Sequence, residues 1–155
     1  MGLPTLWRAS KYKEEAEEFY KHLKGRMEHF GMTLEESKTR LIEFGMFAEE
    51  RCRRKGRKPE TFTFLGFTYY CSHGRNGKFR VKRKTSRKKF AKKCKEINHL
   101  IRDMRTKPLK AIIKKLNEIL VGYYHYYGIT DSIQSLSNFR YQMMKSLFKW
   151  LNRRS

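Results

Sequence analysis

The sequence predicts an α+β chain, in which one helix and a few antiparallel strands precede a three-helix bundle. Two kinds of periodicity support this. Apolar residues recur at helical spacing near the amino terminus and in three later segments, whereas they alternate with polar residues on both sides of an Asn-Gly step. With 155 residues, 39% of them hydrophobic, the chain is long enough for one ordinary core.

The first sixty residues are expected to contain one helix, one strand and a loop. Ser10 is predicted to cap a helix that stops at Gly31. Residues 39–44 are β-branched and aromatic, which favours a short strand, and the polar residues 47–58 are expected to form a loop. The apolar stripe of the predicted helix comprises Tyr12, Ala16, Phe19, Leu23, Met27 and Phe30.

A β-hairpin is predicted in the middle of the chain. The segments 61–70 and 78–84 flank the Asn76-Gly77 step, and both residues of that step tolerate the positive φ angles of a tight turn. On the second strand, Phe79 and Val81 are expected to pack inward. The alternating positions, which would present cations outward, are Lys78, Arg80 and Lys82.

Three helices are predicted after the hairpin. Ser86 is expected to cap the first, Pro108 to open the second, Gly128 to end it, and Asp131 or Ser132 to cap the third. Short connections between them favour a bundle. The predicted core positions of these helices are Phe90, Cys94, Ile97, Ile101, Met104, Leu109, Ile112, Leu116, Ile119, Tyr123, Tyr127, Leu136, Phe139, Met143, Leu147 and Trp150.

Positive charge is concentrated in the middle of the chain. The net charge is +22, and residues 51–95 hold 18 Lys and Arg against the single Glu60. Such a block favours a polyanionic partner, with nucleic acid ahead of a membrane; an unstructured basic loop is the alternative interpretation. The candidate nucleic-acid-binding residues alternate on the second strand or follow Ser86 at helical spacing, away from the predicted core: Arg80, Lys82, Lys84, Arg87, Lys88 and Lys92.

Cysteine and histidine usage gives no metal or cofactor signal. Cys52, Cys71 and Cys94 form no CxxC pair, so we expect three reduced thiols and neither a zinc site nor a disulfide framework. Cys71 and His73 are close in sequence, but two ligands make no site. No apolar run approaches the length of a membrane span and no secretion signal is evident, so we expect a cytoplasmic protein.

Several motifs, in this order and spacing, resemble one protein family. They are FGMTLEESKTRLIEFG, GRKPETFTFLGFTYYCS, KRKTSRKKFAKKCKEI, LNEILVGYYHYYG and FRYQMMKSLFKWLNRRS. Together they resemble the downstream part of group II intron reverse transcriptases. The resemblance implies a palm remnant in residues 1–85 and the thumb, or maturase-specific domain X, in residues 86–155. It also implies that a hairpin like the family's primer grip contains Phe64, Leu65, Gly66 and Phe67.

The family's catalytic YxDD motif has no counterpart in this sequence. It would precede the first helix, where MGLPTLWRAS stands instead, and the chain's two aspartates, Asp103 and Asp131, fall in the thumb segment. We therefore expect no polymerase activity from this chain, because two-metal phosphoryl transfer needs carboxylate ligands. Lys38 aligns with the family's proposed general acid, although a solvated lysine before a strand is the simpler interpretation.

The resemblance implies maturase-type binding of RNA, either group II intron RNA or an RNA/DNA duplex, without a cofactor. One alternative is the carboxy-terminal half of a split reverse transcriptase that needs a separate amino-terminal fragment, and another is a relic without function. The aromatic run before Gly128 also leaves two interpretations open. Tyr123 and Tyr127 are assigned to packing, whereas Tyr124, His125 and Tyr126 could stack on unpaired bases.

Overall fold

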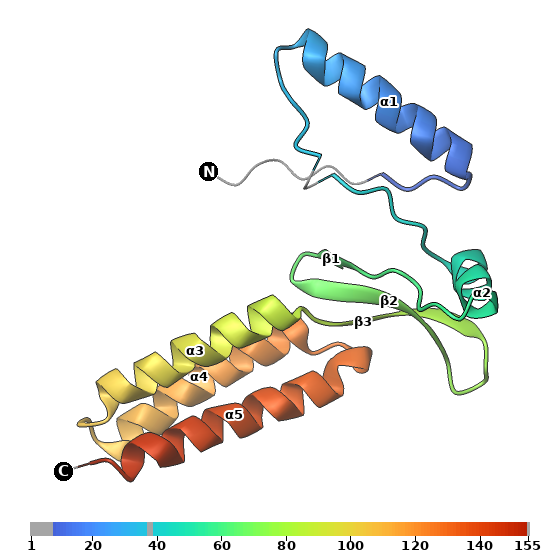
Figure 1. Cartoon of the computed structure of the whole chain (residues 1–155). Helices are drawn as coiled ribbons and strands as arrows, with labels where there is room; N and C mark the ends of the chain where they lie inside the picture. The colour runs from blue at the N-terminus through green and yellow to red at the C-terminus, as the bar shows by residue number, and fades with distance from the viewer. Residues whose placement is uncertain (1–7, 37–38, 155) are drawn as a thin grey trace. The chain divides into compact units, whose positions relative to one another are not determined.

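The computed structural model describes residues 8–36 and 39–154, which fall into two compact units, Met1–Glu60 and Thr61–Ser155. The first unit contains two helices, and the second contains a three-stranded sheet and three long helices (Figure 1). The predicted α+β class is therefore confirmed. The sheet and the three helices belong to one unit. The resemblance implied a boundary between a palm remnant and a thumb at residues 85 and 86, and this boundary stays a prediction.

Helix α1, Lys13–His29, is the helix predicted for the first unit. Its N-cap is Tyr12 and not the expected Ser10, whose hydroxyl donates instead to the Glu15 carboxylate at 2.6 Å. The helix buries none of its residues, and even the stripe residues Phe19 and Met27 are only half-buried. This helix therefore has little packing to stabilise it within its own unit.

Two predictions in the first unit are wrong. Residues 39–44 form no strand, because a strand needs a partner for its backbone groups and the described residues of this unit include no strand that could pair with them. The expected loop contains helix α2, Met46–Arg54, whose alanine, glutamate and arginine residues are good helix formers. An ion pair between Arg54 and Glu50, one turn apart, supports this helix.

The sheet of the second unit has the order β1-β2-β3 and is antiparallel throughout. Its strands are β1 (Phe62–Phe64), β2 (Phe67–His73) and β3 (Phe79–Thr85). The predicted hairpin is confirmed by β2 and β3, but its expected first strand is divided in two. Leu65 and Gly66 both have positive φ, at 47° and 82°, and form a two-residue turn between β1 and β2.

The predicted Asn-Gly turn is present between β2 and β3, with one difference. Only Gly77 has positive φ, at 72°, while the side-chain oxygen of Asn76 accepts a hydrogen bond from the Lys78 amide. Gly77 donates to the carbonyl of Gly74, and Gly74 donates to that of Lys78. This is the three-residue loop in which a glycine in the left-handed region ends the turn.

The three helices of the second unit follow the predicted boundaries closely: α3 (Arg87–Met104), α4 (Leu109–Tyr127) and α5 (Ile133–Leu151). A short 3₁₀ helix, η1 (Thr130–Ser132), joins α4 to α5. Most of the core is built where these helices face one another, and Phe139, Ile101 and Ile112 are fully buried there. This core gives the second unit a rigid support for the side chains on its outer surfaces.

None of the helices in the described part of the chain is both long and apolar enough to cross a bilayer.

Candidate nucleic-acid interface

The cations of β3 and α3 lie on consecutive elements, because β3 ends at Thr85 and α3 begins at Arg87. Ser86 between them is buried and is the N-cap of α3, as predicted, although its side chain makes no capping hydrogen bond. Its backbone amide donates to the Gly66 carbonyl at 2.8 Å. This bond ties the start of α3 to the β1-β2 turn, so strand and helix keep a fixed geometry at their junction.

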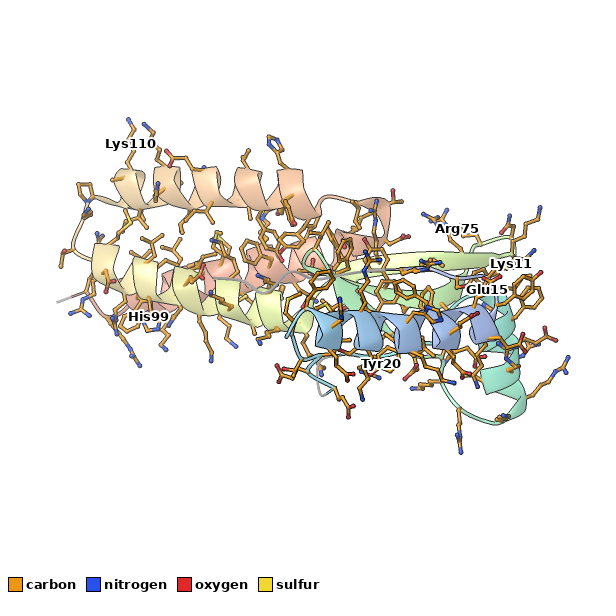
Figure 2. All side chains as sticks on the ribbon, turned by 90° about the horizontal axis from the view of Figure 1, so that it is seen from above. Lys11, Glu15, Tyr20, Arg75, His99 and Lys110 are labelled. Atoms are coloured by element: carbon orange, nitrogen blue, oxygen red, sulfur yellow. The ribbon has the colours of Figure 1, made fainter. Side chains whose placement is uncertain are left out.

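The outer side of α3 carries exposed cations. Ile97 and Ile101 face the core, and Lys88, Lys92 and Lys95 are exposed about half a turn away from them. His99, which is labelled in Figure 2, follows Lys92 by two helical turns and is also exposed, so it continues this outer stripe.

Most cations of α3 have no acidic partner. In the part of the chain that is described, Lys93 pairs with Glu96 at 3.2 Å, whereas no carboxylate forms an ion pair with Arg87, Lys88, Lys92 or Lys95. The positive charge of this surface is therefore largely uncompensated by the protein itself.

The three candidate cations of β3 have different environments. Arg80, Lys82 and Lys84 alternate along the strand and lie on one side of the sheet, opposite Ser72, Tyr70 and Thr68 of β2. Lys84 is exposed, with its ammonium 5.1 Å from the centre of the Tyr70 ring. Lys82 is half-buried.

Arg80 is engaged with the protein itself. Its guanidinium forms an ion pair with the Asp131 carboxylate at 3.5 Å, across 51 positions of sequence.

The expectation that Val81 packs inward is wrong. Val81 is 41% exposed, and Phe79 is only half-buried. Val81 lines a pocket of about 420 Å³ that opens beside Gly128–Asp131. The sheet is therefore not packed against a helix at Val81. The side of β3 that carries Val81 is therefore open at Val81 and reaches the core only at Thr85, which is buried.

Two motifs that are distant in sequence meet where the β1-β2 turn lies on the carboxy-terminal end of α4. The Tyr126 hydroxyl donates to the Leu65 carbonyl at 2.9 Å. A side chain at Gly66 would lie 3.0 Å from the Tyr127 hydroxyl, so the backbone approaches α4 closely here. Phe67, which is buried, packs against both tyrosine rings, with ring centres 5.8 and 5.2 Å apart.

The four residues that the resemblance assigned to a primer-grip hairpin form this turn and its flanks. Phe64 and Phe67 pair across it, whereas Leu65 is 66% exposed at its tip. The turn therefore presents one apolar side chain to solvent, while its backbone is held by α4.

The aromatic run of α4 is chiefly a packing element. Tyr123 is buried and stacks on Phe139 with ring centres 3.6 Å apart, and half-buried Tyr127 packs against the same core, as predicted for both. Burial raises the pKa of Tyr123 and of Tyr127 above the ordinary tyrosine value. Tyr124 is half-buried against the core, and the Tyr126 hydroxyl donates its hydrogen bond to the Leu65 carbonyl.

Within the described residues, no group of three or more His, Cys, Asp and Glu side chains could hold a metal ion. Cys94 faces the helical core, and burial raises the pKa of its thiol. Both aspartates lie beside arginines, Asp103 next to Arg102 at 3.2 Å and Asp131 next to Arg80. Lys38 lies outside the described residues.

Comparison with known protein families finds a match for the three-helix segment. A family model described as "Group II intron, maturase-specific domain" matches residues 87–155, which include α3, α4 and α5. No curated protein and no solved structure gives a significant match. The segment that carries the outer cations of α3 is thus similar to a group II intron maturase-specific domain.

Proposed function

We propose that this chain binds structured RNA in the manner of a maturase, through a basic face that comprises Lys82, Lys84, Arg87, Lys88 and Lys92; Arg80, which the sequence also suggested, pairs with Asp131 instead. The observation that carries the proposal is the row of unpaired cations on the outer side of α3, within the segment similar to the maturase-specific domain. Group II intron RNA is the partner that the family match implies. An RNA/DNA duplex is a second polyanion that the same face could hold.

The basic face suits recognition of RNA shape and backbone. Its lysine and arginine side chains can neutralise phosphates and release condensed counterions, which makes binding strong at low salt and weak at high salt. The deep groove of an A-form helix hides the base edges from such side chains, so contacts go chiefly to phosphate and ribose. The affinity would then depend on RNA fold more than on its sequence.

The cations of the basic face can be substituted without disturbing the core, because they lie apart from it. Phe90, Cys94 and Ile97 pack on the opposite side of α3 from Lys88 and Lys92. Because surface substitutions away from the core change stability little, glutamine at the cationic positions should weaken RNA binding and leave the fold intact.

We further propose that the chain has no polymerase activity of its own. Phosphoryl transfer by two metal ions needs positioned carboxylates, and the YxDD motif that supplies them in the family has no counterpart in the sequence. The ion pairs of Asp103 and Asp131 with arginines also make these carboxylates poor replacements.

A second candidate function, completion of a split reverse transcriptase by a separate amino-terminal fragment, is favoured by helix α1. This helix buries no residue, and the apolar side chains of Tyr12 and Phe30 at its ends are 56% and 63% exposed. An apolar stripe without a cover is typical of a surface that packs against another polypeptide.

The affinity of purified protein for a folded group II intron RNA tests the proposed function. The triple variant Arg87→Gln, Lys88→Gln and Lys92→Gln should bind at least about ten-fold more weakly than the original chain. The matched control neutralises Lys11, Lys21 and Lys24, which lie among the acidic residues at and near α1; Lys24, for example, pairs with Glu36 at 3.0 Å. Equal losses in both variants would mean that binding is diffuse attraction to a basic protein.

A further inference from the structure

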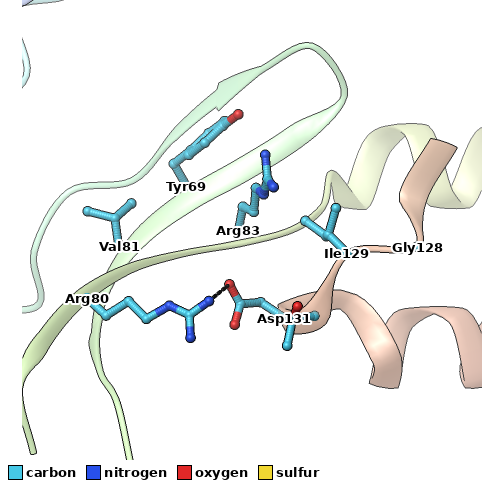
Figure 3. A pocket seen from close by; sticks show the side chains of 8 residues that line it. Tyr69, Arg80, Val81, Arg83, Gly128, Ile129 and Asp131 are labelled. Atoms are coloured by element: carbon cyan, nitrogen blue, oxygen red, sulfur yellow. Dashed lines mark hydrogen bonds and ion pairs between the residues drawn. The ribbon is translucent and has the colours of Figure 1, made fainter.

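The pocket between the sheet and the α4-α5 connection has the composition of a nucleotide site. Tyr69, Arg80, Val81 and Arg83 of the sheet line one wall, and Gly128–Asp131 lines the other (Figure 3). Its volume of about 420 Å³ lies in the range of small-molecule sites and would accommodate one nucleotide. A double helix would not enter a pocket of this size.

The charges of the pocket favour a single phosphate group. Arg80 is neutralised by Asp131 at 3.5 Å, and the Asp131 side chain is only 13% exposed. Arg83, by contrast, has no ion pair within the described part of the chain, and its guanidinium lies 5.8 Å from the centre of the Phe67 ring. One uncompensated guanidinium therefore remains to meet an anion, and arginine binds phosphate oxygens in a two-pronged geometry.

The aromatic wall suits an unpaired base. Phe62 stacks on one face of Tyr69, with ring centres 5.0 Å apart and planes at 8°, which holds the tyrosine ring in a fixed orientation. Tyr69 and Arg83 are cross-strand partners, and Figure 3 shows both projecting from the same side of the sheet. A base that packs against Tyr69 and Val81 would thus carry its phosphate toward Arg83, and base stacking on tyrosine is tolerant of base identity.

We propose that this pocket receives one unpaired nucleotide of the bound RNA, with its phosphate at Arg83 and its base against Tyr69 and Val81. The proposal rests on the proposed function, because the nucleotide belongs to the RNA that the basic face holds. The ion pair of Arg80 with Asp131 joins β3 to the α4-α5 connection and so fixes the far wall of the pocket.

Two hairpin RNAs that differ only in one bulged adenosine test the proposal. The original chain should bind the bulged RNA about ten-fold more tightly than the fully paired one. Arg83→Gln and Tyr69→Leu should both remove this preference without changing affinity for the paired RNA, whereas Tyr69→Phe, which keeps the ring, should retain it. Arg75→Gln, at the exposed tip of the hairpin, is the matched charge control and should leave the preference unchanged.

The outcomes separate the two proposals. If the original chain binds both RNAs equally, or if Arg83→Gln weakens both by the same factor, the nucleotide pocket is wrong while RNA binding stands. If adenosine 5′-monophosphate alone saturates the pocket and the bulge confers no preference, the site serves free nucleotides and the proposal fails. If the chain binds neither RNA, the proposed function fails together with the pocket.

Discussion

Replacement of Gly66 by alanine should weaken the attachment of the sheet to the helices. Gly66 has a φ of 82°, in the left-handed region, and an added Cβ would lie 3.0 Å from the Tyr127 hydroxyl. We expect the variant to fold with the same secondary structure and with a clearly lower free energy of unfolding. The loss should come from two sources that can be measured separately.

The first source is conformational. An L-residue in the left-handed region costs roughly 1–2 kcal/mol. The second is the contact with Tyr127, which is closer than side-chain carbons normally approach, so the ring must shift against its neighbours. If that shift costs about 1 kcal/mol, the low end of the range for overpacking, the total loss is about 2–3 kcal/mol, a large part of the stability of a small domain.

Urea denaturation of four variants would apportion the loss. Gly77→Ala is the matched control, because Gly77 also has positive φ, at 72°, but nothing lies within 4 Å of the added Cβ. The Gly66 variant should therefore lose more stability than the Gly77 variant. Tyr127→Phe removes the contacting oxygen, so the double variant with Gly66→Ala should recover part of the difference. Equal losses at Gly66 and Gly77 would refute the close approach of the turn to α4.

Three further predictions concern stability and activity. Because burial raises the pKa of Tyr123, the folded state holds the hydroxyl proton more tightly than the unfolded chain; stability should be unaffected by this group below about pH 10 and fall above it. Tyr123→Phe should reduce that alkaline loss in denaturant titrations, and an unchanged loss would exclude Tyr123 as its source. Hydrogen exchange should be faster in α1, which buries no residue, than in α4 and α5, and the reverse order would contradict the packing described here. Primer extension with Mg²⁺ should show no incorporation above background, and activity of the purified chain would overturn the proposal that it lacks catalysis.

The helices that were predicted correctly are those whose apolar residues recur at helical spacing over a long segment. Helices α3, α4 and α5 each repeat core residues over about five turns, so a local error in propensity hardly shifts them. Helix α2 has only nine residues and was mistaken for a loop, because its charged residues hide a short run of good helix formers. Strand formation at residues 39–44 depended on a partner strand, which a local pattern cannot reveal.

The candidate site was predictable only in part. Alternation and helical spacing placed Lys84, Lys88 and Lys92 on exposed surfaces, where the structure has them. The ion pair of Arg80 with Asp131 joins residues 51 positions apart and has no local signal. For the same reason Arg83 was not a candidate, since its importance arises from a pocket that the α4-α5 connection completes. The Leu65-Gly66 turn was missed because a leucine with positive φ is rare.

The salt dependence of RNA affinity tests the central claim, that the outer face of α3 contacts RNA phosphates, most directly. Each phosphate contact contributes just under one unit to the slope of log affinity against log salt concentration, so neutralising Arg87, Lys88 and Lys92 together should flatten the slope by roughly two to three units. The triple variant at Lys11, Lys21 and Lys24, which removes the same charge, should leave the slope nearly unchanged. A slope that changes equally in both variants, or in neither, would contradict the assignment of RNA binding to α3.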